Sequence, residues 1–364
     1  MFNNLNKYFN QILLSLKTKF DEKIPCNENT FIVAELCSKS HSEIVPGFCK
    51  YLLDLGYDVT AIVHPDRIKE GLFCRFKDDK LTLYPMRKKK FLKYFNKHNL
   101  GLAKGILITT AGKLLKEYDY EAAYNFFKKQ NDNQKVMLVE HEIKYGIDKG
   151  TLPKNIITLR KMDYKNAETV PINPHYFGNI KITSKNDITN FVTIGKITDI
   201  KKNTNLFIDT ACNLIKNNIT NFKITVIGTG NIKHLPEEIK PYIDIKGHLT
   251  FSDMYNELEK ADFILTAYED KPDHIRYITT GTSGAFQLVY GFLKPVIIKD
   301  NFAPINEFNN ENSILYSDDK DFYNAMVRAT NLTSQEYQII QTNLKNYVDK
   351  LYNESKNNLQ NLIN

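Results

Sequence analysis

The sequence predicts an α/β protein built from two domains, each a parallel sheet covered by helices. Short apolar segments rich in β-branched and aromatic residues alternate with segments of helical periodicity, which is the pattern of parallel sheets. This alternation occurs in two series, and a polar segment containing Pro171 and Pro174 separates them. A chain of 364 residues is also long enough for two domains that each bury a core.

The first series predicts an amino-terminal domain, which we assign to residues 1–170. A helical pattern runs over residues 46–55, between the first two predicted strands. Glu35, His64 and His141 lie near the carboxyl ends of predicted strands, at the edge where open α/β sheets bind ligands. The predicted strands of this domain are residues 31–36, 58–64, 81–86, 105–111, 135–141 and 155–160.

A linker, a second domain and a terminal helix follow. We assign residues 171–188 to the linker and residues 189–334 to the second domain. Apolar residues then recur at helical spacing, with a weak place at Ser355, and predict a long helix over residues 335–364. Two such domains facing each other would form a cleft between the carboxyl edges of their sheets. The second series predicts strands at 190–197, 222–230, 243–249, 263–269, 295–300 and 313–317, and helices at Asn205–Lys216 and Phe251–Lys260.

The amino-acid composition limits which binding partners and which cellular compartment we expect for this protein. Lys and Arg number 49 against 42 Asp and Glu, a net charge of +7. This excess suits an anionic ligand or membrane surface and is too small to indicate a dedicated nucleic-acid binder. Five scattered cysteines without CxxC spacing predict reduced thiols and argue against a disulfide framework or a cysteine metal site. No apolar run approaches the roughly 20 residues of a membrane-spanning helix, so we expect a cytoplasmic protein.

The segment Phe263–Asp300 carries the strongest local signal of a binding site. It reads as a strand, a loop, a turn rich in Gly, Ser and Thr, a helix and a strand. The turn, Thr279–Gly284, supplies small residues that let backbone N–H groups approach an anion, and the following helix adds the positive end of its dipole. Arg276 and His274 lie directly upstream. The alternative is a helix that a hydroxyl of the turn caps, with nothing bound.

Six motifs follow one another in the second half of the chain. They are Val192–Lys196 with Lys201 and Lys202 after it, Val226–Gly230, Ile245–His248, Phe251–Ala261, Ser283–Gly284 and Lys294–Ile297. In this order and spacing they resemble the donor domain of GT-B glycosyltransferases of the group-1 type, over roughly residues 190–320. The first half matches only as a generic Rossmann-like domain. The resemblance implies two Rossmann-like domains facing across a cleft, a nucleotide-sugar substrate, and metal-independent sugar transfer without a cofactor.

The resemblance also implies a donor site. Lys196 and Lys202 would contact the diphosphate, because preplaced cations stabilise the charge of a departing nucleoside diphosphate. The paired glutamates usual in the family are missing, and Leu288 and Thr280 stand in their places. Hydroxyl and amide groups would then hold the sugar, with Glu269 restoring one carboxylate. The implied donor-binding residues are Gly195, Lys196, Lys202, Gly228, Gly230, Glu269, Arg276, Thr280, Thr282, Ser283, Gly284 and Gln287.

Three residues of the first domain are candidates for removing a proton from the acceptor hydroxyl. The loop 37–43 directly follows the first predicted strand and carries His41 and Glu43. His141 ends a later strand and is followed by Glu142. An inverting transfer needs such a base, whereas a retaining transfer does not, and the sequence leaves both outcomes open. The structural alternatives for His41 and Glu43 are helix capping and surface polarity.

Residues 1–20 and 87–99 are amphipathic and basic. Either segment could dock on an anionic membrane that presents a lipid-linked acceptor, or pack its apolar face on a sheet. We expect a role in cell-surface polysaccharide synthesis, with a glycan or lipid-linked acceptor. The alternatives are a catalytically silent nucleotide-sugar-binding partner of another transferase, which the missing glutamates favour, and a nucleotide-sugar epimerase. No nucleic-acid motif, zinc helix or serine-hydrolase elbow accompanies these features.

Overall fold

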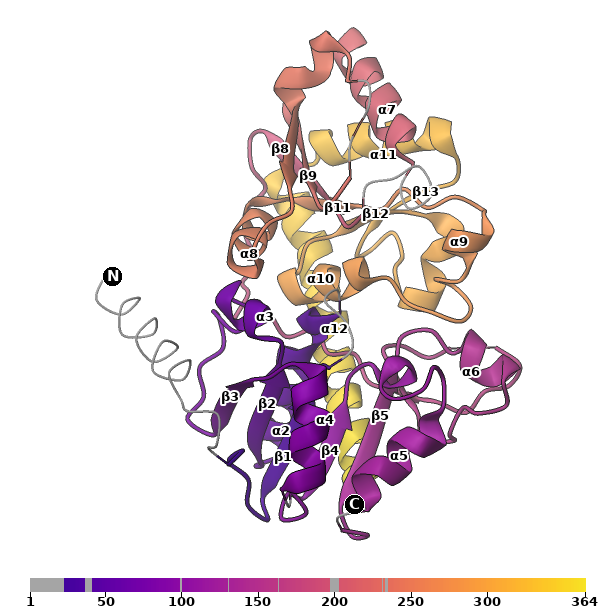
Figure 1. The fold of residues 1–364 in the computed structure, drawn as a ribbon. Coiled ribbons are helices and arrows are strands. Elements are labelled where there is room, and N and C mark those ends of the chain that lie inside the picture. The colour runs from indigo at the N-terminus through magenta and orange to yellow at the C-terminus, as the bar shows by residue number, and fades with distance from the viewer. Residues whose placement is uncertain are drawn as a thin grey trace.

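The computed structural model describes residues 23–36, 41–98, 100–129, 131–162, 164–196, 203–230, 232 and 235–364. These residues form two lobes, one above the other in Figure 1, and each lobe contains one parallel sheet with helices packed on it. The first lobe is the seven-stranded sheet with its helices, and the second lobe is the six-stranded sheet with its helices. The predicted α/β class with two parallel sheets is confirmed.

Seven parallel strands build the first lobe. They are β1 (Thr30–Ala34), β2 (Asp58–Val63), β3 (Leu81–Pro85), β4 (Gly105–Ile108), β5 (Lys135–Glu140), β6 (Ile157–Thr158) and β7 (Val170–Pro171). They pair in the order β3-β2-β1-β4-β5-β6-β7. The connections hold η1 (Ser42–Ile44), α2 (Val45–Asp54), α3 (Pro65–Lys69), α4 (Lys88–Lys97), η2 (Ala111–Lys113), α5 (Tyr120–Lys128) and α6 (Lys144–Asp148).

Six parallel strands build the second lobe. They are β8 (Thr189–Ile194), β9 (Phe222–Ile227), β10 (Ile243–Gly247), β11 (Phe263–Leu265), β12 (Val296–Lys299) and β13 (Ile314–Tyr316). Their order is β10-β9-β8-β11-β12-β13. The connections hold α7 (Thr204–Lys216), η3 (Glu237–Tyr242), α8 (Phe251–Lys260), α9 (Pro272–Ile275), α10 (Gly284–Phe292), η4 (Asp300–Phe302), η5 (Pro304–Asn306) and α11 (Asp319–Asn331).

The last helix, α12 (Ser334–Ile363), joins the two lobes. It begins with a capping box in which Thr333 and Glu336 each satisfy the other's backbone N–H. Near its start Tyr337 belongs to a core of the second lobe, whereas Leu359 near its end belongs to a core of the first lobe. Figure 1 shows this yellow helix running from the upper lobe into the lower one.

The helix α12 continues through Ser355, which the sequence marked as a weak place. Ser355 is buried, and its Oγ accepts a hydrogen bond from the backbone N–H of Asn173 at 3.0 Å. The hydroxyl therefore ties the helix to the segment between the two sheets. The hydrogen bond to Asn173 explains why a serine lies on the apolar face of α12, and the helix does not break there.

The amphipathic segment 87–99 forms α4, and its apolar face packs on the first sheet. Phe91 and Phe95 are fully buried in a core of this lobe, and Leu92 and Tyr94 pack against that core. Core packing thus accounts for the apolar face, and the basic face remains outside. Residues 1–20 lie outside the described residues. Within the part of the chain that the structure describes, no helix has the length and apolar character needed to cross a bilayer.

Candidate active site between the two lobes

The turn before α10 is joined directly to the first lobe. Glu142 and Gly281 form an isolated antiparallel β-bridge between the lobes. Beside it, the backbone N–H of Ile143 donates to the carbonyl of Thr280 at 2.8 Å. The predicted anion-binding turn therefore faces the carboxyl ends of the strands of the first lobe, as two facing open sheets require.

A buried arginine fastens the same turn. Arg160 is 8% exposed, and its Nε and Nη2 donate to the Gly281 carbonyl at 3.1 and 2.8 Å. Nη2 also donates to the Tyr277 carbonyl at 3.1 Å, and Nη1 donates to the Lys161 carbonyl at 2.6 Å. Burial lowers the pKa of Arg160 to about 10, so the guanidinium stays charged at neutral pH. A second arginine, Arg276, lies with Nη1 3.6 Å from Glu142 Oε2.

The first turn of α10 is capped and lies beside an acidic side chain of the other lobe. Ser283 Oγ accepts hydrogen bonds from the Ala285 N–H at 3.3 Å and from the Tyr268 hydroxyl at 2.7 Å. A Cβ atom placed on Gly284 would lie 3.2 Å from Glu43 Oε1. The end of the helix that attracts anions is thus exposed at Gly284 and faces a carboxyl group.

Two of the predicted bases lie in contact. The rings of His41 and His141 have centroids 4.3 Å apart. His141 Nε2 is 2.9 Å from the Thr109 carbonyl, which places the proton on Nε2 and leaves Nδ1 as an acceptor. Burial, the main cause in both residues, lowers the pKa of His41 to about 3 and that of His141 to about 4. Both rings are therefore neutral near pH 7, and both are weak bases.

Glu35, at the carboxyl end of β1, lies next to this pair. The hydroxyls of Thr109 and Thr110 each donate to its Oε2 at 2.6 Å, and its negative charge opposes the lowering of the His41 pKa. Burial raises the pKa of Glu43 to about 8, with a further increase from the charge of Glu35. Of the three predicted bases, Glu43 alone has a pKa near the range in which general bases work best.

The glycines predicted in the second lobe bring three loops together at the carboxyl edge of its sheet. Gly195 and Gly228 have φ angles of +122° and +144°, and a Cβ on Gly228 would lie 1.8 Å from the Gly195 carbonyl oxygen. The N–H of Gly228 also donates to the Gly247 carbonyl at 2.8 Å. Only glycine fits this approach. Gly230 follows with φ +127°, and Lys196 is exposed beside these loops.

The remaining residues predicted to bind the donor vary in exposure and in their hydrogen-bond partners. Glu269 lies four residues beyond the end of β11, where it forms an ion pair with Lys271. Gln287 is fully buried, and neither of its amide atoms has a hydrogen-bond partner among the described residues. Thr280 is buried and Thr282 is partly exposed in the turn. Lys202 lies outside the described residues.

His64 lies directly after the carboxyl end of β2, as expected, and its ring makes a structural contact there. Its Nδ1 accepts a hydrogen bond from the backbone N–H of Asp66 at 3.3 Å and caps α3. Sequence reasoning missed Arg160, although it ends a predicted strand. Its partners are carbonyl oxygens of the other lobe, which leave no trace in the local sequence.

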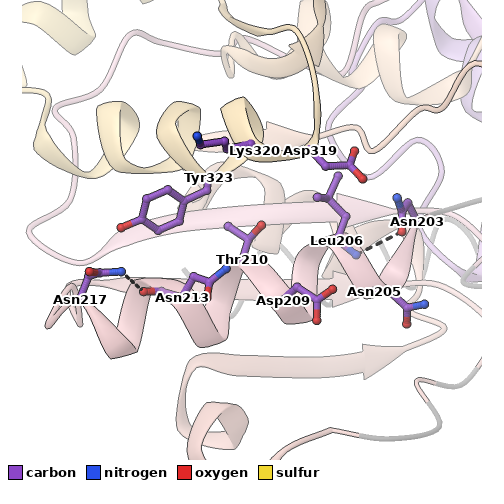
Figure 2. Close-up of a pocket in the computed structure, with 10 residues that line it drawn as sticks. All are labelled: Asn203, Asn205, Leu206, Asp209, Thr210, Asn213, Asn217, Asp319, Lys320 and Tyr323. Atoms are coloured by element: carbon purple, nitrogen blue, oxygen red, sulfur yellow. Dashed lines mark hydrogen bonds between the residues drawn. The ribbon is translucent and has the colours of Figure 1, made fainter.

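A groove of about 440 Å³ lies elsewhere, between α7 and α11, and Figure 2 shows the side chains along it. Most of its lining residues carry polar side chains, and Asn203 among them caps α7 by accepting the Leu206 N–H at 3.1 Å. None of the groove residues belongs to the turn 279–284 or to the first lobe. They are Asn203, Asn205, Leu206, Asp209, Thr210, Asn213, Asn217, Asp319, Lys320 and Tyr323.

No family model and no curated protein sequence matches the chain. Solved structures do match. Staphylococcus aureus TarM, as a variant in complex with fondaparinux, alpha-GlcNAc-glycerol and UDP, superposes with a TM-score of 0.57 at 10% identity, covering 92% of this chain and 100% of that one. The pneumococcal O-GlcNAc transferase GtfA, in complex with UDP and GlcNAc, gives 0.56 at 11% identity, covering 92% and 98%.

A plant structure, Arabidopsis thaliana UGT89C1 complexed with quercetin, gives a TM-score of 0.53 at 10% identity and covers 92% of this chain and 98% of that one. These proteins are GT-B glycosyltransferases. The similarity spans both sheets of this chain and nearly the whole of each matched chain. The chain therefore has the GT-B fold, which confirms the fold that the six motifs indicated.

Proposed function

We propose that the protein is a glycosyltransferase that moves a sugar from a nucleotide-sugar donor to a glycan or lipid-linked acceptor. The observation that supports this most strongly is the apposition at the lobe boundary. The turn before α10, with its helix start at Gly284, meets the loops of the first lobe that carry Glu43 and His141. Donor phosphate and acceptor hydroxyl would thus approach each other from opposite lobes.

The donor would bind to the second lobe. Its diphosphate would lie at the start of α10, where the free N–H groups and helix dipole favour an anion, with Lys196 and Arg276 as neighbouring cations. Such groups stabilise the leaving diphosphate without a metal ion. UDP is present in the TarM and GtfA structures, so UDP-sugars are the first donors to test.

The acceptor would be activated from the first lobe. Glu43 lies beside Gly284 and has a pKa raised to about 8, so above that pH its carboxylate can take the proton of an acceptor hydroxyl. His41 and His141 are both neutral, and each would donate a hydrogen bond to a sugar hydroxyl or accept one from it. This assignment corresponds to an inverting transfer.

The cellular role and location of the enzyme are also proposed. A role in cell-surface polysaccharide synthesis, in the cytoplasm or at the inner membrane face, fits the scattered cysteines and the exposed basic residues of α4, which include Lys89, Lys93 and Lys97. A catalytically silent donor-binding partner remains the second candidate, because no paired carboxylates stand before Lys294–Ile297.

A nucleotide-release assay tests the proposal. The purified protein is incubated with several UDP- and TDP-sugars, with and without oligosaccharide or lipid-linked acceptors, and free nucleoside diphosphate is measured. A silent partner would bind a nucleotide without releasing it, and an epimerase would change the sugar nucleotide with no acceptor present. Absence of both binding and release for every donor would contradict the proposal.

The first variant for this assay is Lys196→Ala. Loss of a cation that meets the diphosphate should weaken UDP binding by about tenfold in calorimetry. Lys216→Ala is a matched control, because Lys216 is an exposed lysine in the last turn of α7. Equal affinities in parent and Lys196→Ala proteins would remove Lys196 from the donor site.

A further inference from the structure

Two tyrosine rings stack on the surface of the first lobe. Tyr118, just before α5, and Tyr145, in α6, have ring centroids 5.1 Å apart and an angle of 16° between their planes. Tyr145 is 52% exposed. The ammonium group of Lys149 lies 5.2 Å from the centroid of the Tyr118 ring. Each ring covers part of one face of the other, so the aromatic surface that the pair presents to solvent belongs mainly to Tyr145, with Lys149 as a hydrogen-bond donor beside Tyr118.

The backbone holds Tyr118 in an unusual conformation. Its φ angle is +56°, in the left-handed region that a bulky side chain rarely adopts. Its N–H donates to the Gly112 carbonyl at 2.7 Å, and its carbonyl accepts from Thr151 Oγ1 at 2.7 Å. Such a conformation costs roughly 1–3 kcal/mol and persists only where its surroundings fix it. The ring is therefore positioned before any ligand arrives.

The tyrosine pair is continuous with the proposed acceptor side of the cleft. A Cβ on Gly112 would lie 2.3 Å from Glu140 Oε2 and 2.9 Å from Tyr118 Cδ1, so the Tyr118 ring and the Glu140 carboxyl pack on the same glycine. Glu140 directly precedes His141. Tyr145 lies three residues after Glu142, which forms the isolated bridge to Gly281 of the second lobe. Figure 1 shows α6 on the side of the first lobe that faces the second.

We propose that Tyr118 and Tyr145 form a platform that binds the acceptor as a glycan, and this inference rests on the proposed function. The apolar CH face of a pyranose ring packs on an aromatic face, while tyrosyl hydroxyls and Lys149 hydrogen-bond to sugar hydroxyls. An open, flat surface suits an extended saccharide. A planar aromatic acceptor would instead require an enclosed apolar pocket, which a residue as exposed as Tyr145 does not provide.

The test measures saccharide binding in the absence of donor. Chitotriose, maltotriose and mannotriose are titrated into the parent protein, Tyr145→Ala and Tyr124→Ala while chemical shifts or heats are recorded. Tyr124 is a matched control because it is a 40% exposed tyrosine on α5. We expect at least one trisaccharide to bind the parent, about fivefold or greater weakening in Tyr145→Ala, and unchanged affinity in Tyr124→Ala.

Three results would overturn the platform. In the first, none of the trisaccharides binds the parent protein. In the second, the parent and Tyr145→Ala bind a trisaccharide with equal affinity. In the third, no saccharide binds, but a flavonol binds and loses affinity in Tyr145→Ala. Tyr118→Phe keeps the ring and removes only a hydroxyl, so it should weaken binding less than Tyr145→Ala does. Nucleotide release by the parent is measured separately, so a failed platform and a failed transferase proposal give different results.

Discussion

Glu43 lies where the two lobes meet. The sequence offers it as a first-turn acid or a base. In the structure its carboxyl lies beside Gly284 of the other lobe, and burial raises its pKa from an ordinary 4.5 to about 8. A protonated carboxyl at neutral pH is typical of sites where a proton is handled.

The raised pKa of Glu43 predicts how stability depends on pH. Between pH 4.5 and pH 8 the unfolded state loses this proton while the folded state keeps it, so the contribution of Glu43 becomes increasingly destabilising as pH rises through that window. Glu43→Gln should therefore unfold at a higher temperature than the parent at pH 8.5 and at nearly the same temperature at pH 4.5. The shift is about 1–2 °C for each kcal/mol recovered, measured by thermal melts.

Activity supplies a second measurement on the same variant. If the carboxylate is the base, kcat/KM of the parent should rise up to about pH 8, and Glu43→Gln should lose about 10²-fold or more of the rate. Glu121→Gln, an exposed acid in the first turn of α5, is the control. A flat profile in the parent between pH 6.5 and 9 would exclude Glu43 as the base.

The grouping of Glu35, His41 and His141 could be predicted from the sequence, because each lies at or just after the carboxyl end of a parallel strand. Those ends meet at one edge whatever the order of the strands. The strand β4 lies between β1 and β5, and Thr109, directly after β4, contacts both Glu35 and His141. What the sequence could not supply is the degree of burial, which makes both histidines weak bases.

At the scale of elements, the turn before α10 depends on the first lobe for its position. Its carbonyls at Tyr277 and Gly281 accept hydrogen bonds from the buried Arg160, and its Thr280 carbonyl accepts from Ile143. A guanidinium carries five donors in a fixed fork, which suits a turn with several carbonyls exposed together. The predicted donor site is thus held from the lobe opposite to the one that contains it.

Replacing Arg160 should loosen this turn. Arg160→Met keeps much of the side-chain volume but removes charged hydrogen bonds to three carbonyls, so we expect a loss of about 2–3 kcal/mol in urea unfolding. Hydrogen exchange should accelerate over residues 276–284, and donor affinity should fall.

Arg75→Met is the matched control for this prediction. Arg75 also joins the lobes through a bidentate pair with Glu259, but Glu259 is 48% exposed, so we expect this pair to contribute only about 1 kcal/mol. Equal effects of the two substitutions would contradict the role assigned to the buried arginine.

Some helices and strands could be predicted from sequence patterns alone, and others could not. The predicted helix Phe251–Lys260 matches α8 at both ends, because Thr250 caps it and its apolar spacing is regular. The strand β7 was not predicted, since two residues that include Pro171 give no alternating pattern and proline is confined to edge strands. Its place at the edge of the first sheet is set by its neighbour β6.

At the scale of the whole molecule, three histidines couple the fold to pH. Burial lowers the pKa of His41 from 6.5 to about 3, and it lowers that of His141 and of His175, in the segment between the sheets, to about 4. These rings stay neutral in the folded protein while the unfolded chain binds protons below pH 6.5. Stability contributed by the neutral rings is therefore lost as pH falls from about 6.5 toward 4.

The corresponding measurement is the free energy of unfolding at pH 7, 6 and 5. Each histidine should contribute a loss of up to about 1.4 kcal/mol per pH unit below its unfolded pKa. Glu43 acts in the opposite direction over this range, so the net slope is smaller than the sum of the three histidine contributions. His41→Gln, which cannot take up a proton, should lower the slope by up to about 1.4 kcal/mol per pH unit. A stability that is constant from pH 7 to pH 5, or an unchanged slope in His41→Gln, would contradict this expectation.

The path of α12 has a consequence for biosynthesis. Leu359 and Ile363 complete the core that β1, β2 and α2 begin, although about 300 residues separate them in the chain. The amino-terminal half emerges from the ribosome long before those side chains are synthesised, so part of its apolar core surface stays uncovered until then. Truncating the last dozen residues should accordingly make the nascent protein dependent on chaperones, even with every residue of the proposed cleft intact.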